Sequence, residues 1–436
     1  MNSLVSRVKS MDRHQLETIF TSSAFMVTAG LTFVNTFLLA NALGDDGRGA
    51  VAAAYGNTIV LGWAFQIGLP AAAAYFAKDV GIRRVSMSAW AMTSFYAVPM
   101  AALLIPFFAW QMQGDVFDDF GTDLKIWYVA FIILNLFNGP FLSAIFWLRG
   151  TGNTVKFNGL LALPQLLITL GYLVLFLLDE LTVFSALTST FVMMTIGWSV
   201  GLVSTRALPG RGFSMPVFKK MRHYAIRSWA GNLSFVVSLR FDQMLLVGVV
   251  SSEDLGVYAV AAAFSTISGA VARGVAQGVL PFVRKAASDE ERLDRVRQAL
   301  IWVAVASIGT LAIIAGSAKF VVPFLLGDDF ERSVRPLLFL LPGAFATDVN
   351  QVYTTALSAF NRPQDASKAQ FASAITTGAG LALLVGPYGI IGAAITTSIA
   401  YWVALLVSIY YWNRLKAAVL RGEATGHTES IEDVLT

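Results

Sequence analysis

The sequence predicts an all-α polytopic membrane protein with about twelve transmembrane helices, and three observations support this fold class. The 436 residues are 56% hydrophobic and only 13% charged, whereas about a quarter of a soluble domain is charged. Apolar runs of about 20 residues, the length that crosses the hydrocarbon of a bilayer, recur along the whole chain. Positive charge is concentrated in alternate loops between these runs.

Each predicted helix is an apolar run bounded by short polar loops. In chain order, the predicted helices span 17–43, 50–77, 85–110, 124–148, 155–178, 181–205, 223–250, 254–283, 296–318, 334–360, 366–387 and 389–412. Proline and glycine weaken membrane helices, and they predict hinges at Gly68-Leu69-Pro70, Gly139-Pro140, Leu280-Pro281 and Pro342-Gly343.

The loops fall into two alternating sets by charge. The termini and the loops after every second helix hold 23 of the 31 Lys and Arg residues. The other loops are acidic, as at Asp45-Asp46 and Asp118-Asp119, and hold only five: Arg48, Lys125, Lys319, Arg332 and Arg335. Because Lys- and Arg-rich loops stay in the cytoplasm, both termini are predicted to be cytoplasmic and the acidic loops external.

The two halves of the chain resemble each other at an offset of about 207–211 residues. The matched stretches are Leu43-Gly44-Asp45-Asp46-Gly47 with Val250-Ser251-Ser252-Glu253-Asp254, Phe117–Phe120 with Gly327–Phe330, and Phe146–Asn153 with Leu357–Gln364. Two six-helix units enter the membrane in the same direction, so a pseudo-two-fold axis along the membrane normal and a site between the units are expected. The predicted organisation is a cytoplasmic N-terminus (1–16), two six-helix bundles around a central cavity (17–205 and 223–412), a basic cytoplasmic linker (206–222) and a cytoplasmic tail (413–436).

Several predicted helices carry a narrow polar stripe, as expected where helices line a water-filled cavity. At about 100° per residue, the stripes contain Thr28 and Asn35 in the first helix, Arg227 and Asp242 in the seventh, Arg273 and Gln277 in the eighth, and Asp348 in the tenth. For the Ser and Thr residues of these stripes taken alone, hydrogen bonding between helices is the simpler interpretation.

The charges within the helices are the strongest functional signal, because a charge near the bilayer centre costs a few kcal/mol or more. Arg240 lies about 200° around the helix from Asp242, so the two charges face opposite sides of a straight helix. Arg227, near a helix end, could instead extend to the interface. The arginines either form neutralising ion pairs with Asp242 or Asp348, or bind phosphate, which suits the guanidinium fork.

The residue types that are missing or lie elsewhere exclude several other functions. The chain has no cysteine, which rules out disulfides and thiolate metal sites. None of the three histidines lies in the interior of an apolar segment, and the net charge of +4 reflects loop composition. No metal, cofactor or nucleic-acid partner is therefore expected, and the external loops are too short for a catalytic domain.

Two stretches resemble bacterial polysaccharide flippases of the O-antigen and teichoic-acid type, which belong to the multidrug/oligosaccharidyl-lipid/polysaccharide exporter superfamily. Arg240–Leu246 followed by Leu255–Ala261 is similar to the start of their second half, and Leu43–Gly49 to their first external loop. With the repeat, the resemblance covers about residues 15–412. It implies an alternating-access carrier with a cationic cavity, which flips a polyprenyl-pyrophosphate-linked oligosaccharide across the bacterial inner membrane on an ion gradient.

Our first hypothesis is therefore a monomeric lipid-linked oligosaccharide flippase that works with a polysaccharide polymerase. Its expected substrate contacts are Arg273, Arg240, Arg227, Asn35, Thr28 and Gln277, with Asp242 and Asp348 balancing charge or carrying a proton or sodium ion. A cation-coupled drug antiporter of the same superfamily is the second hypothesis, and a membrane enzyme that acts on polyprenyl lipids is the third. The central arginines and aspartates cancel, while Arg227 makes the wider lining positive, which favours an anionic substrate.

Overall fold

The structure is a computed structural model that describes residues 13–210, 212–269, 288–360 and 362–421. Every regular element in these ranges is helical. In the first half the elements are α2 (Arg13–Val51), η1 (Ala52–Gly56), α3 (Asn57–Phe65), α4 (Leu69–Tyr75), η2 (Phe76–Lys78), α5 (Ile82–Met92), η3 (Thr93–Ala97), α6 (Val98–Leu103), α7 (Ile105–Gln111), α8 (Asp115–Asp119), α9 (Gly121–Leu136), α10 (Asn138–Gly150), α11 (Thr154–Leu177) and α12 (Val183–Thr205). In the second half they are α13 (Met215–Leu246), α14 (Ser252–Ser265), α16 (Asp289–Leu326), η4 (Asp328–Ser333), α17 (Val334–Ala359) and α18 (Pro363–Leu420).

The helices are long and apolar enough for a multi-pass membrane protein, as predicted. Six helices in the described ranges could cross a membrane, and a bent pair at 82–111 could be a seventh. Two of the six contain a sharp kink at a glycine with positive φ, Gly44 in α2 and Gly389 in α18. A straight helix of 58 residues like α18 would measure about 87 Å, far more than the roughly 30 Å of bilayer hydrocarbon. Each kink therefore divides its helix into two predicted spans.

Within the described residues, the twelve predicted apolar segments coincide with helices, although some are broken. The predicted hinge in the second segment is a real break, because α3 ends at Phe65 and both Ile67 (φ 47°) and Gly68 (φ 66°) adopt left-handed conformations. Such a φ is uncommon for a β-branched residue. Pro342, by contrast, lies inside the continuous helix α17. The second part of the predicted helix 254–283 and its Leu280-Pro281 hinge lie outside the described residues.

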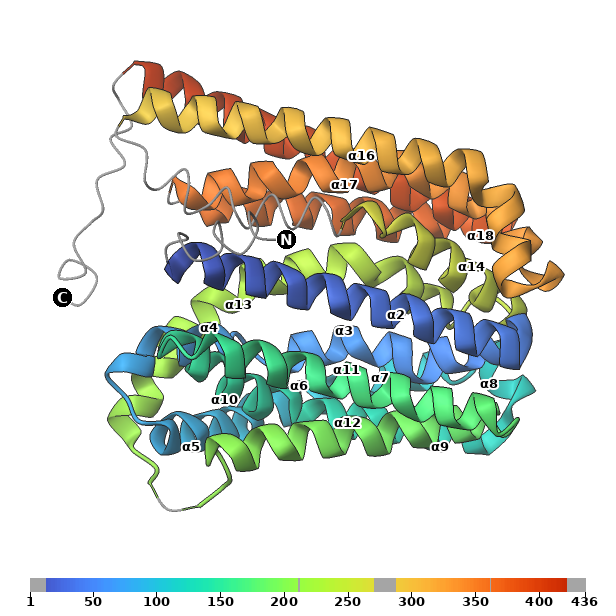
Figure 1. Ribbon diagram of the computed structural model, residues 1–436, viewed down its shortest axis with the longest axis horizontal. Helices are drawn as coiled ribbons and strands as arrows, with labels where there is room; N and C mark the ends of the chain where they lie inside the picture. The colour runs from blue at the N-terminus through green and yellow to red at the C-terminus, as the bar shows by residue number, and fades with distance from the viewer. Residues whose placement is uncertain (1–12, 211, 270–287, 361, 422–436) are drawn as a thin grey trace, which may run out of the picture.

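Helix α13 begins at Met215, inside the range 206–222 that the sequence predicts as a linker. Pro216 lies in its first turn, where a missing backbone N–H costs no hydrogen bond. In Figure 1, α3–α12 lie below and α14, α16, α17 and α18 above, with α2 and much of α13 between them. Helix α13 packs against α3, α4 and α5 of the first half and against α18 of the second.

The acidic turns gather at one end of the molecule, at the right of Figure 1. This acidic end comprises the kink of α2 at Gly44, α8 and η4. Helix α2 packs extensively on α14, and the side chain of Asn41 donates a hydrogen bond to the carbonyl oxygen of Leu325 at 2.8 Å. The two halves of the chain are therefore in direct contact at the acidic end.

Candidate functional site between the two halves

Asp242 is buried inside the second half, with 4% of its surface exposed. Its Oδ2 accepts hydrogen bonds from the hydroxyls of Tyr258 (2.5 Å) in α14 and Thr397 (3.1 Å) in α18. Its Oδ1 accepts the backbone N–H of Gln243 at 2.8 Å. Hydrogen bonds to a charged group are worth about 1.5–3 kcal/mol each, so these three donors can hold a carboxylate that water does not reach.

Arg240 is half-buried on α13, and helix geometry puts it about 200° around the axis from Asp242. Its Nη1 donates to the side-chain oxygen of Gln243 at 3.0 Å. Within the described ranges no carboxylate lies close enough to Arg240 for an ion pair. The ion pair with Asp242 that the sequence left open is therefore not formed.

Arg48 corrects one assignment made from the sequence, which counted it in an external loop. The structure places it in the helical part of α2 that follows the kink at Gly44. Its Nε atom is buried and has no hydrogen-bond partner among the described residues. The Arg48 guanidinium lies within electrostatic range of Arg240 and of the Tyr172 hydroxyl.

The internal repeat contained a signal for the position of Arg48. Extending the alignment of Gly44 with Ser251 puts Gly49 opposite Gly256. Gly256 falls inside the predicted helix 254–283, so its counterpart and the adjacent Arg48 are expected to be helical too. A hydropathy window misses this because the stretch from Gly44 to Gly49 contains two aspartates, one arginine and three glycines.

The two arginines form the most distinctive feature between the halves, and we call them the arginine pair. Arg48 comes from α2 of the first half and Arg240 from α13 of the second. Neither has an ion-pair partner in the part of the chain that the structure describes. Because Arg48 and Arg240 lie within electrostatic range of each other, their like charges repel, and burial weakens the screening by water. The arginine pair can therefore gain free energy by binding an anion.

Two further predicted site residues lie in the part of α2 that precedes the kink at Gly44. Asn35 is 8% exposed and its side-chain oxygen lacks a hydrogen-bond partner among the described residues. In the alignment of the repeat Asn35 stands opposite Asp242. Thr28 is half-buried, and its carbonyl oxygen accepts the hydroxyl of Thr32 at 2.9 Å.

The remaining predicted residues are not brought together with the arginine pair by any described contact. Arg227 is exposed on α13. Asp348 is 3% exposed and accepts a hydrogen bond from Ser307 at 2.6 Å, between α16 and α17. Arg273 and Gln277 lie outside the described residues. Their roles remain predictions.

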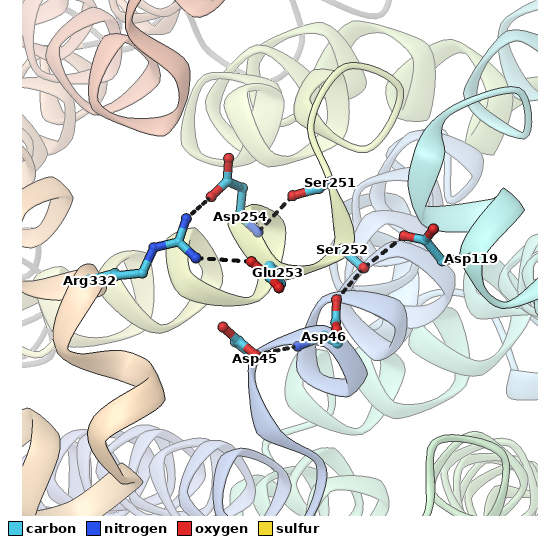
Figure 2. A network of polar contacts seen from close by, with 8 residues as sticks. All are labelled: Asp45, Asp46, Asp119, Ser251, Ser252, Glu253, Asp254 and Arg332. Atoms are coloured by element: carbon cyan, nitrogen blue, oxygen red, sulfur yellow. Dashed lines mark hydrogen bonds and ion pairs between the residues drawn. The ribbon is translucent and has the colours of Figure 1, made fainter.

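At the acidic end a buried serine joins the two halves (Figure 2). Ser252, 1% exposed, starts α14 of the second half. Its hydroxyl lies 2.5 Å from Asp46 Oδ1 in α2 and 3.0 Å from Asp119 Oδ2 in α8. Because both carboxylates belong to the first half, this one hydroxyl links the halves.

Arg332 of η4 reinforces the same end from the side of the second half (Figure 2). It pairs with Glu253 at 3.0 Å and Asp254 at 2.6 Å. The hydrogen bond to Glu253 raises the pKa of the Arg332 guanidinium. Ion pairs as exposed as these contribute about 0–1 kcal/mol, so they orient η4 more than they stabilise it.

Comparisons with known proteins agree with this architecture. Residues 163–335 match a family described as polysaccharide biosynthesis protein, and no curated protein matches the sequence. An inward-facing multidrug transporter of the MATE family is similar with a TM-score of 0.74 at 13% identity, over 94% of this chain and 100% of that one. The lipid II flippase MurJ, in an inward closed conformation, gives 0.71 at 13% identity over 91% and 87%. An outward-facing MATE transporter gives 0.60 at 14% identity over 93% and 96%.

Identities this low establish the fold and not the substrate. The helical repeat, the match over residues 163–335 and the two strongest of these structural similarities agree with one another. The chain therefore has the fold of the multidrug/oligosaccharidyl-lipid/polysaccharide exporter superfamily of transporters and flippases, as the sequence resemblance implied.

Proposed function

We propose that this protein is a flippase that moves a polyprenyl-pyrophosphate-linked oligosaccharide from the cytoplasmic to the outer leaflet of a bacterial inner membrane, for cell-surface polysaccharide synthesis. The arginine pair carries this proposal, because Arg48 and Arg240 come from opposite halves and neither is neutralised by a described carboxylate. A pyrophosphate linkage is anionic and offers several acceptor oxygens, which matches two guanidinium groups.

A cationic drug fits the same site poorly. It would have to approach two positive charges in surroundings where water screens them weakly. The match to a polysaccharide biosynthesis family and the similarity to a lipid II flippase support a lipid-linked substrate. The fold similarity to multidrug transporters supports the carrier mechanism equally well for either substrate.

In the proposed cycle the halves of the chain rock about the site between them. The acidic end, external by the distribution of positive loops, is closed by the contacts of Ser252 and Asn41, so the substrate enters from the cytoplasmic side. Separation of the halves moves Arg48 away from Arg240 and weakens their joint grip on the anion. The substrate is then released to the outer leaflet.

Asp242 is the proposed coupling residue, with a proton or sodium ion as the coupling ion. Its ligands come from α13, α14 and α18, so a change in its charge alters the contacts of three helices at once. Asp348 is the second proposed coupling carboxylate. Arg227, Arg273, Asn35, Thr28 and Gln277 remain proposed substrate contacts, and a monomer beside a polysaccharide polymerase remains the proposed assembly.

The test is transport of a fluorescent polyprenyl-pyrophosphate oligosaccharide in proteoliposomes. Arg48→Ala and Arg240→Ala should each weaken lipid binding about 10- to 100-fold, the equivalent of a charged hydrogen bond of about 1.5–3 kcal/mol. Arg335→Ala, an exposed arginine on α17, is the matched control and should bind normally. If wild-type protein instead exports a cationic dye and leaves the lipid unmoved, the antiporter hypothesis replaces this one.

A further inference from the structure

Gln243 contacts two oppositely charged neighbours through different parts of the same residue. Its backbone N–H donates to Asp242 Oδ1 at 2.8 Å, and its side-chain oxygen accepts from Arg240 Nη1 at 3.0 Å. Residues three apart on a helix face each other, so the regular geometry of α13 brings Arg240 and Gln243 together. Gln243 thus fixes both charged side chains in place.

The carboxylate of Asp242 accepts its hydrogen bonds from other groups than Arg240. Tyr258 and Thr397 donate to its Oδ2, and the Gln243 backbone donates to its Oδ1. All three donors hold the carboxylate towards the interior of the second half. The acid closest in sequence to Arg240 is therefore kept from pairing with it.

The amide of Gln243 is well suited to orient an arginine without cancelling its charge. An amide oxygen accepts a hydrogen bond from a guanidinium but carries no net charge. A glutamate at position 243 has nearly the same shape, could accept the same hydrogen bond and would form an ion pair with Arg240. Asp242 lies within electrostatic range of Arg240, but no described carboxylate forms an ion pair with Arg240. The positive charge of the site therefore depends on an uncharged acceptor at position 243.

We propose that Gln243 is a positioning residue, which holds the Arg240 guanidinium in place and leaves its positive charge free for the pyrophosphate of the substrate. This inference rests on the proposed function. The inference extends the proposed function, because it makes the positive charge of the site depend on an uncharged amide outside the arginine pair.

Two substitutions distinguish the two proposed roles of Gln243, which are to hold Arg240 in place and to add no negative charge beside it. Gln243→Glu retains the acceptor but adds a negative charge, and Gln243→Leu removes the acceptor without adding charge. If the side chain at position 243 must be uncharged, Gln243→Glu weakens binding of a polyprenyl-pyrophosphate lipid at least 10-fold, and Gln243→Leu weakens it only a few-fold. If Gln243 only holds Arg240, the Glu variant binds normally and the proposal is overturned.

Gln165→Glu is the matched control, because Gln165 is also a half-buried glutamine within a spanning helix, α11. It reports the general cost of placing a carboxylate in such a helix. Lipid binding by this variant should remain at the wild-type level. An equal loss of binding in both Glu variants would overturn the proposal.

A second measurement does not involve the substrate. Thermal unfolding of the purified full-length protein in detergent is compared for Gln243→Glu in the native background and with Arg240→Met. The new ion pair should raise the midpoint of unfolding only when Arg240 is present. An equal effect in both backgrounds would show that the two side chains do not interact, which overturns the positioning role whatever the substrate is. If the unfolding data show that residues 240 and 243 interact but the wild-type protein binds no pyrophosphate lipid, the proposed substrate is overturned instead.

Discussion

Gly49 and Gly256 pack backbone against backbone where the second arm of α2 crosses α14. A Cβ added to Gly49 would lie 1.8 Å from the carbonyl oxygen of Ser252, and one added to Gly256 would lie 1.9 Å from that of Asp45. The internal repeat aligns Gly49 with Gly256 and Asp45 with Ser252, so each half presents the equivalent glycine to the equivalent carbonyl of the other. This reciprocity is expected of a contact on a pseudo-two-fold axis.

The close contact of Gly49 with α14 predicts that a single added methyl group hinders closure of the acidic end. Gly49→Ala must push the two backbones apart, and overpacking of this kind costs about 1–3 kcal/mol. We expect the variant to populate states with an open acidic end, and the measurement is modification of a cysteine introduced there. Gly309→Ala is the control, because a Cβ on Gly309 meets nothing within 4 Å. Equal modification rates in the two variants would contradict the prediction.

A reversible cross-link can test whether the acidic end must open during transport. Asn41 donates to the carbonyl oxygen of Leu325 across the halves, and the chain has no native cysteine. Asn41→Cys with Leu325→Cys, joined through disulfide bonds by a short bis-methanethiosulfonate cross-linker, should stop lipid flipping until a reductant cleaves the disulfides. The two single variants serve as controls. Full transport by the cross-linked protein would show that this end does not open.

Ser252 should contribute measurably to the closed state, because its hydroxyl lies within hydrogen-bond distance of Asp46 and Asp119 of the other half and can donate its hydrogen to either. Ser252→Ala should shift the equilibrium towards an open acidic end about 10-fold, which is the equivalent of about 1.4 kcal/mol. Spin labels across the two halves would measure the populations. Ser317→Ala is the control, since Ser317 bonds to a carbonyl of its own helix. Unchanged distance distributions in Ser252→Ala would rule out a role for this hydroxyl in closure.

Asp242→Asn should separate energy coupling from substrate binding. The amide keeps an oxygen for Tyr258 or Thr397 but has no charge to exchange with a coupling ion. Flipping should lose its acceleration by an ion gradient, while lipid affinity changes less than 3-fold. Gradient-driven and gradient-free flipping in proteoliposomes give the comparison, with the exposed Asp179→Asn as control. Acceleration by the gradient that survives in Asp242→Asn would remove Asp242 from the coupling mechanism.

The span pattern, the repeat and the superfamily resemblance could be predicted from the sequence. Hydropathy over about 20 residues is a property of contiguous residues, so the segment boundaries at 43 and 389 anticipated the kinks at Gly44 and Gly389. Helix periodicity alone also separated Arg240 from Asp242 by face. These inferences need only the spacing of residues along one helix.

The composition of the site was decided by tertiary structure. The approach of Arg48 to Arg240 joins α2 to α13, and the hydrogen bonds of Tyr258 and Thr397 to Asp242 join α14 and α18 to α13. The sequence determined where the chain crosses the membrane, because a span depends on local apolar length. Which charges remain unpaired depends on how distant helices pack, and that is why the approach of Arg48 to Arg240 and the neutral contact of Gln243 emerged only from the folded structure.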